Sequence, residues 1–178
     1  MTIRTADPDG DAAACAAIYA PHVEAGATSF EEEPPGATQF AERIAHTATT
    51  YPWLVAEREG EVVGYAYACP HRARPAYRWA VEVSVYVAAD ARDRGQGRAL
   101  YEELLERLRR QRFQIACAGI TLPNDASVAL HEGLGFIAVG VYRRIGWKDG
   151  AWRDVGWWQL ELEPAGEGRP VEPLPPEP

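Results

Sequence analysis

Two short stretches of the sequence place polar or flexible residues where they could do chemistry. The first holds a single carboxylate, Glu82, inside the apolar run "RWAVEVSVYVA" at residues 78–88. The second is "RGQGR" at residues 94–98, with two glycines between arginines. A carboxylate among small apolar neighbours can accept a proton from an amine. A glycine turn that opens a helix can bind phosphate, because free N–H groups and the helix dipole both favour an anion.

Each stretch also has a purely structural explanation. Gly95 and Gly97 would equally suit a strand-to-helix turn that only needs flexible residues, and Glu82 could lie on a solvated sheet face. Two familiar phosphate motifs are excluded. The Walker loop needs a Lys followed by Ser or Thr, and the dinucleotide fingerprint needs a third glycine, whereas Arg98 and Ala99 follow Gly97. The surrounding elements therefore decide between the two explanations.

The elements on either side of the turn are a strand and a helix. Residues 78–88 alternate, which places Trp79 and the valines at 81, 83, 85 and 87 on one face and Ala80, Glu82, Ser84 and Tyr86 on the other. Residues 97–112 form an amphipathic helix, with leucines at 100, 104, 105 and 108. The glycine turn thus lies at a helix N-terminus, next to the strand that holds Glu82.

The rest of the chain predicts an α/β (α+β) domain over residues 1–163 and a proline-rich, extended tail over 164–178. The other expected strands are 2–6, 53–58, 62–68, 115–122, 136–146 and 152–162. The other expected helices are 9–24, capped near Asp9 or Asp11, then 38–49 and 124–134. A hairpin followed by alternating strands and helices is typical of a mixed sheet, here of about seven strands, with helices on both faces.

Composition excludes several classes of function. The net charge of −8, with one lysine, disfavours nucleic acid as a partner. No apolar run is long enough for a membrane helix and the N-terminus lacks a signal peptide, so we expect a cytoplasmic protein. The three cysteines form no CxxC pair, which argues against a disulfide framework or a metal site and favours small buried side chains. No GxSxG motif supports nucleophilic hydrolysis.

The stretch "YVAADARDRGQGRALYEEL", followed by "LPNDASVALHEGLGF", resembles the acetyl-CoA signature of the GCN5-related N-acetyltransferase (GNAT) superfamily. Further segments are similar to phosphinothricin N-acetyltransferases and to the related methionine sulfone and sulfoximine acetyltransferases. These segments are "YPWLVAEREGEVVGYAYACPHRARPAYRWAVEVSVYV", "GWKDGAWRDVGWWQLELE" and "RPVEP". The resemblance covers most of residues 28–173 and implies the GNAT fold, in which splayed strands form the acetyl-CoA cleft.

The resemblance implies a cofactor site and assigns residues to it. The backbone of Val85 and Val87 would hold the pantetheine arm by strand-like pairing, and Asn124 would bond the same arm, although Asn124 also suits a helix N-cap. The residues expected around the pyrophosphate are Asp93, Arg94, Gly95, Gln96, Gly97 and Arg98. Acetyl-CoA is thus the expected cosubstrate, with no metal.

The resemblance also implies two catalytic residues. Glu82 matches the family's proposed general base, which removes a proton from the substrate ammonium so that the amine attacks the thioester directly, without a covalent intermediate. His131 matches the second catalytic position, where it would assist deprotonation or orient the substrate. The alternative for His131 is a structural role near a helix end.

For the substrate pocket, the resemblance implies Arg72 and Arg74 as cations for an acidic group, and Phe30, Tyr77 and Tyr86 as lining aromatics. The alternative is that the arginines are solvated and the aromatics belong to the core. Two departures stand out: Arg72 replaces a frequent lysine, and Val83 replaces a polar residue after the base. The tryptophans of the last hairpin are expected in the hairpin, the core or a dimer contact, and a homodimer is expected.

The implied activity is acetyl transfer from acetyl-CoA to the α-amine of a small amino acid analogue, of the phosphinothricin, methionine sulfoximine or methionine sulfone type, in detoxification or amino acid handling. One rival is a protein or peptide N-terminal acetyltransferase, which would need a wide, open groove. Another is a non-catalytic module that binds acyl-CoA.

Overall fold

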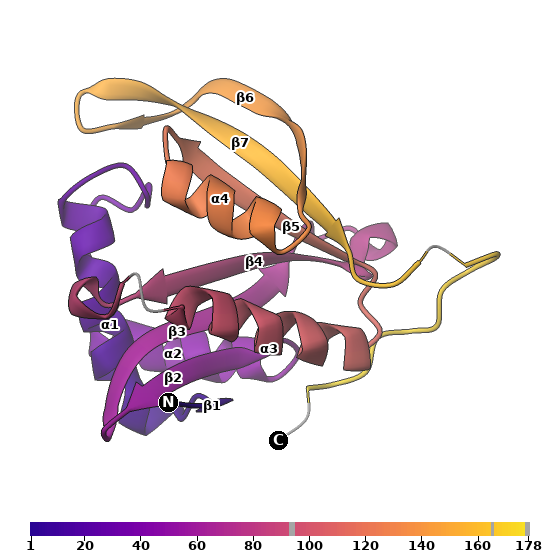
Figure 1. Ribbon diagram of the computed structural model, residues 1–178, viewed down its shortest axis with the longest axis horizontal. Helices are drawn as coiled ribbons and strands as arrows, with labels where there is room; N and C mark the ends of the chain where they lie inside the picture. Colours follow the sequence, from indigo (N-terminus) through magenta and orange to yellow (C-terminus); the bar gives the residue numbers. More distant parts are fainter. Residues whose placement is uncertain (93–94, 165, 177–178) are drawn as a thin grey trace.

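Seven strands form a single mixed sheet in the computed structural model, which describes residues 1–92, 95–164 and 166–176 (Figure 1). The strand order is β1-β2-β3-β4-β5-β7-β6. Only β4 and β5 are parallel neighbours within these residues. The strands are β1 Thr2–Thr5, β2 Trp53–Arg58, β3 Glu61–Pro70, β4 Ala80–Val87, β5 Ile115–Leu122, β6 Ile137–Lys148 and β7 Ala151–Glu161. The predicted mixed sheet is confirmed.

Two helices cover each face of this sheet, as Figure 1 shows. They are α1 Pro8–Glu24, α2 Ala37–Ala48, α3 Gln96–Arg110 and α4 Asp125–Gly133; the short turns η1 Pro75–Tyr77 and η2 Ala89–Ala91 are 3-10 helices. The leucines of α3 pack with Val81 and Val83 in one core. Cys15 of α1 and Phe40 of α2 pack with Tyr65 in the other. The side chain of Val83 thus faces α3, and that of Glu82 faces the opposite side.

The first helix begins one residue earlier than predicted, and its N-cap differs from the predicted one. Asp7, not Asp9 or Asp11, is its N-cap, because Pro8 fixes the first helical position and the Asp7 carboxylate accepts from the N–H of Asp9. Asp11 instead makes two hydrogen bonds to Arg4, at 2.7 and 2.8 Å, and this guanidinium lowers the pKa of Asp11. Asp11 therefore joins α1 to β1 and does not cap the helix.

The feature that positions the site is the short pairing between β4 and β5. The two strands pair only from Ala80 to Glu82, against Ile115 to Cys117. Beyond Glu82, β4 continues to pair with β3, while β5 continues to pair with β7. A cleft therefore opens between β4 and β5, and Glu82 lies at its vertex.

The chain returns after β7 to the C-terminal end of α3. In the tail, the N–H of Leu174 donates to the carbonyl of Gln111 at 2.8 Å, and the buried Gln111 side chain donates to the carbonyl of Leu174 at 2.8 Å. The indole N–H of Trp79 donates to the carbonyl of Val171 at 2.8 Å. The tail thus contacts the residues that lead into β4.

Candidate active site

The backbone of β4 presents free hydrogen-bonding groups to the cleft. The carbonyl of Ala80 accepts from His71 on the β3 side, and Ala88 donates to Val63 on that same side. The β3–β4 register between these points has no irregularity, so even-numbered residues of β4 bond to β3. The N–H and C=O groups of Val85 and Val87 therefore face the side where β5 has moved away.

A groove of about 630 Å³ extends from this cleft to the start of α3. It brings together most of the residues predicted to hold the cofactor: Val85, Val87, Gly95, Gln96, Gly97, Arg98 and Asn124. Asp93 and Arg94, predicted for the same site, lie outside the described residues. The sequence positions are far apart, but the fold places them along one groove.

The glycine turn forms the far end of this groove. Gly95 is the N-cap of α3 and has φ +80, a left-handed conformation that favours glycine. Among the described residues, no side chain caps the helix here. A Cβ built on Gly97 would lie 3.6 Å from Val87 and 3.7 Å from Leu130, so a larger side chain there would fill the floor of the groove. Arg92 and Arg98 add positive charge beside the turn.

Asn124 caps a helix, as one of its two sequence-based explanations expected, and it also lies in the groove. Its side-chain oxygen accepts from the N–H of Ser127 at 3.1 Å, which makes it the N-cap of α4. Asn124 also lines the groove and the narrower cleft behind it.

Glu82 makes an asymmetric set of hydrogen bonds. Its Oε1 lies 3.0 Å from Nδ1 of His71 and 3.1 Å from Nη1 of Arg72. Its Oε2 accepts no hydrogen bond from the described residues. The side chain is half-buried at 29% exposure. One carboxylate oxygen is therefore held by two donors, and the other is available to a ligand.

Two cysteines lie beside Glu82 on the neighbouring strands. Cys69 of β3 and Cys117 of β5 are its register partners, so the three side chains share one face. Burial, followed by the nearby Glu82 carboxylate, raises the pKa of Cys69 to about 11 and raises the pKa of Cys117 in the same direction. Both thiols stay protonated at neutral pH and are weak nucleophiles.

His131 approaches the cleft from the α3 side, the side opposite Glu82. Burial lowers the pKa of His131 and keeps the ring neutral. Its Nδ1 donates to the carbonyl of Ser127 at 2.7 Å, so its Nε2 accepts from the hydroxyl of Tyr101 at 3.0 Å. Burial raises the pKa of Tyr101, which keeps that hydroxyl protonated. Both ring nitrogens are therefore engaged, and no contact joins His131 to Glu82 within the described residues.

Four of the five residues predicted for the substrate pocket lie in β4 or in the segment between β3 and β4. Arg72 lies at Glu82, and Tyr77 lies edge-on to the ring of His71, with 5.8 Å between ring centroids. Tyr86 lines both cavities of the cleft, and burial raises its pKa well above the usual range. Arg74 is exposed before η1.

Phe30 lies farther along, against β6. A Cβ at Gly146 would overlap its ring. The loop of Phe30 is held by Lys148, which donates to the carbonyl of Glu31, and by Arg43, which pairs with the Glu31 carboxylate. The structure therefore places Phe30 on a loop fixed to β6.

Sequence reasoning missed two residues near Glu82, His71 and Trp157. The ring of Trp157 lies 5.9 Å from the guanidinium of Arg72 and 6.0 Å from the ring of His71. Trp157 is the register partner of Gly119 in β5, and its ring covers that glycine. The β3–β4 hairpin register, continued one residue beyond the Pro70–Val81 pair, could have pointed to His71.

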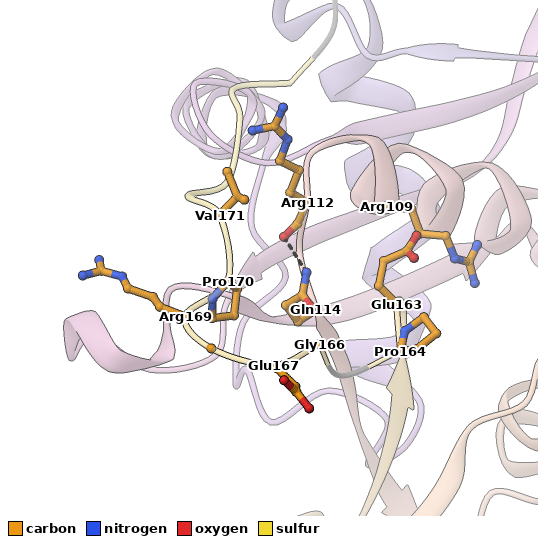
Figure 2. A pocket seen from close by; sticks show the side chains of 11 residues that line it. Arg109, Arg112, Gln114, Glu163, Pro164, Gly166, Glu167, Arg169, Pro170 and Val171 are labelled. Atoms are coloured by element: carbon orange, nitrogen blue, oxygen red, sulfur yellow. Dashed lines mark hydrogen bonds between the residues drawn. The ribbon is translucent and has the colours of Figure 1, made fainter.

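A separate cavity of about 380 Å³ lies between the C-terminal end of α3 and residues 163–171 (Figure 2). In Figure 2 the side chain of Arg112 points upward and that of Arg169 points to the left. None of the site residues predicted from sequence lines this cavity. The chemistry of Glu82 therefore belongs to the cleft and not to this second cavity.

Two general properties complete the site. Over residues 1–92, 95–164 and 166–176, no cluster of three or more His, Cys, Asp or Glu side chains could hold a metal ion. In the same residues, every helix is too short or too polar to span a bilayer.

Comparison with known proteins gives the family. Residues 3–157 match the family described as "Acetyltransferase (GNAT) domain". The chain is 43% identical to the phosphinothricin N-acetyltransferase of Streptomyces viridochromogenes over 92% of this chain and 90% of that protein. It is 36% identical to the L-methionine sulfoximine/L-methionine sulfone acetyltransferase of Salmonella typhimurium, over 92% and 95%.

A solved structure agrees with these relatives. The phosphinothricin acetyltransferase of Sinorhizobium meliloti, in complex with AcCoA, superimposes with a TM-score of 0.90 and 37% identity, over 96% of this chain and 93% of that one. The splayed sheet, the glycine turn and these similarities lead to one conclusion. The chain belongs to the GNAT family and is an acetyltransferase.

Proposed function

We propose that this protein transfers the acetyl group of acetyl-CoA to the α-amino group of a small amino acid analogue, of the phosphinothricin, methionine sulfoximine or methionine sulfone type, in the cytosol. The observation that carries the proposal is Glu82, which offers one unbonded carboxylate oxygen at the vertex of the β4–β5 cleft, beside Arg72. The named relatives support the class of substrate.

The groove fits acetyl-CoA along its length. The unpaired groups of Val85 and Val87 would hold the pantetheine arm as an added strand would, and Asn124 would bond the same arm. The α3 N-terminus, with Arg98 beside it, would hold the pyrophosphate. Acetyl-CoA supplies the thioester that reacts with the amine.

Glu82 acts as the general base. A free amino acid carries an ammonium group at neutral pH, and an ammonium nitrogen has no lone pair for attack. The free Oε2 of Glu82 takes one proton from this ammonium, and the resulting amine attacks the thioester carbonyl. The protonated thiols of Cys69 and Cys117 support direct transfer over an acyl-cysteine route.

His131 has a different role. A neutral imidazole with both nitrogens bonded is poorly placed to take the substrate proton. Of the two roles implied by the family, orientation fits better: His131 fixes the hydroxyl of Tyr101, which lines the cleft.

Arg72 and Arg74 would hold the acidic group of the substrate. Arg72 is half exposed and shares its guanidinium between Glu82 and the carbonyl of His71, so a ligand anion can draw it away at little cost. Tyr77 and Tyr86 would line the space between the arginines and the cleft.

A homodimer is the expected assembly. β6 is an edge strand with a row of exposed apolar side chains: Ile137, Val139, Val141, Tyr142, Ile145 and Trp147. An apolar edge of this kind favours pairing with a second copy. Light scattering after size exclusion should give twice the 19.6 kDa chain mass, and Val139→Lys should give the monomer.

The testing experiment measures thiol release from acetyl-CoA with L-phosphinothricin, L-methionine sulfoximine and L-methionine sulfone. Glu82→Gln should lower kcat by about 10² to 10⁴ and leave acetyl-CoA affinity unchanged, because only the base is lost. Glu161→Gln, on the exposed end of β7, is the matched control. Tight acetyl-CoA binding without turnover of any of the three would refute the proposal, and turnover of peptide N-termini alone would point to the rival peptide acetyltransferase.

A further inference from the structure

We propose that His71 is a positioning residue for the acetyl transfer. It donates its Nδ1 proton to Oε1 of Glu82 and thereby assigns Oε2 as the atom that takes the substrate proton. The inference rests on the proposed function for its kinetic meaning. The contact between His71 and Glu82 itself does not depend on the proposed function.

A carboxylate has two equivalent oxygens until its neighbours distinguish them. Here both neighbouring donors point to the same atom, since His71 Nδ1 and Arg72 Nη1 lie 3.0 and 3.1 Å from Oε1. A charge-assisted bond of this kind fixes the rotation of the carboxylate. Oε2 is then held in one direction, and a general base needs such alignment with the proton it removes.

The ring of His71 is itself held on several sides. Its backbone N–H donates to the carbonyl of Ala80 at 3.4 Å, which continues the β3–β4 ladder. The rings of Tyr77 and Trp157 stand edge-on to it at 5.8 and 6.0 Å between centroids. The side chain is only 19% exposed. A ring packed in this way can hold the carboxylate firmly.

Arg72 cannot serve as the permanent holder of Glu82. Its side chain is 47% exposed, and in the proposed function it turns to the acidic group of the substrate. When Arg72 moves to the ligand, His71 remains as the donor to Oε1. His71 therefore keeps Glu82 aligned in the complex in which the reaction occurs.

The geometry also fixes the tautomer of His71. An ionised Glu82 is an acceptor only, so Nδ1 must carry the proton and a neutral ring leaves Nε2 without one. This assignment concerns atoms of the free protein. It can be measured whether or not an amino acid is turned over.

The kinetic test compares His71→Phe with His71→Asn in the full chain. Phe keeps an aromatic ring in the packing but has no donor, whereas the amide of Asn can place an N–H near the position of Nδ1. We expect His71→Phe to lower kcat by about 10 to 100-fold with unchanged acetyl-CoA affinity, and His71→Asn to restore kcat to within about threefold of wild type. Equal thermal unfolding of the two variants shows that the difference is not one of folding.

A second measurement is independent of turnover. Nitrogen-15 NMR of the histidine rings should show the Nδ1–H tautomer for His71, and Glu82→Ala should abolish that preference. An Nε2–H tautomer in the wild type overturns the inference, as does a His71→Phe variant with near-normal kcat or a His71→Asn variant that loses as much as His71→Phe. If wild type turns over no amine while NMR shows the Nδ1–H tautomer, the proposed function fails and the positioning of Glu82 stands.

Discussion

The proposed active site has two halves, a cofactor half and a substrate half, and different parts of the chain form them. The cofactor half consists of backbone: the open edge of β4, the glycine turn and the N-terminus of α3. The substrate half consists of side chains on loops, and those loops are held by segments far away in the chain, as Lys148 holds Glu31 and the tail holds Trp79. A substitution in the cofactor half should therefore affect only binding at that half. The substrate half should also be affected by substitutions or deletions far away in the chain.

The largest effect should come from filling the floor of the cofactor half. Gly97→Leu would place a branched side chain beside Val85 and Val87, where overpacking costs about 1 to 3 kcal/mol, so acetyl-CoA affinity should fall about 10 to 100-fold. Gly97→Ala is the control, since its Cβ meets only ordinary contacts at 3.6 Å or more. Calorimetric titration measures both, and equal affinities would show that the arm does not pass Gly97.

Removal of the tail should affect the other half alone. Deletion of residues 164–178 removes the Val171 carbonyl from Trp79 and the Glu172 carboxylate from Arg78, the two residues between η1 and β4. Because the loop of Arg72 and Tyr77 then loses its support, the KM for the amino acid should rise about tenfold, the equivalent of one or two hydrogen bonds. Acetyl-CoA affinity should stay constant; a parallel loss of both affinities would contradict the division into two halves.

A smaller effect is expected at the loop of Phe30. Lys148→Met keeps the length of the buried side chain but removes its bond to the carbonyl of Glu31, so the KM for the amino acid should rise about threefold, a loss of less than one full hydrogen bond. Steady-state kinetics measures the change. Lys148→Arg, which retains a donor, should show a smaller rise than Lys148→Met.

The smallest effect concerns pH and folding. Burial lowers the pKa of both His22 and His131 below the value of about 6.5 in an unfolded chain, so the unfolded state binds more protons between those values. The contribution of the two neutral rings to stability is therefore complete above pH 6.5 and is lost as pH falls through the folded pKa values. Urea unfolding from pH 8 to pH 5 should show this decline, and a His22→Asn, His131→Asn double variant should flatten it.

Much of the fold could be predicted from sequence because short-range patterns specify it, whereas the residues of the cofactor half were expected from the family resemblance. Strand alternation placed Glu82 opposite Val83, and the spacing of the leucines put the glycine turn at the start of α3. The cap of α1 was predicted wrongly, since Asp7, Asp9 and Asp11 are all acceptable caps and only Pro8 and the pairing of Asp11 with Arg4 distinguish them. Local pattern alone does not show which acid a distant arginine will bind.

The substrate half was predicted less completely for the same reason. His71 reaches Glu82 across an antiparallel ladder, and Trp157 arrives from a strand about 75 residues further on, through its register with Gly119. The register between strands that lie far apart in the sequence is set when the whole sheet forms, so a local pattern does not reveal it. The sequence therefore pointed to Glu82 as a candidate base but missed the rings of His71 and Trp157 near it.

The contact between the tail and Trp79 also has a consequence for the order in which the protein is made. The ribosome completes β4, β5 and α3 long before it adds Val171 and Glu172, so a nascent chain can assemble the coenzyme groove while the amino acid loop still lacks its last support. An affinity tag fused after residue 178 would follow Glu172 closely in the sequence, whereas one at Met1 would lie at the opposite edge of the sheet from the hairpin of β6 and β7.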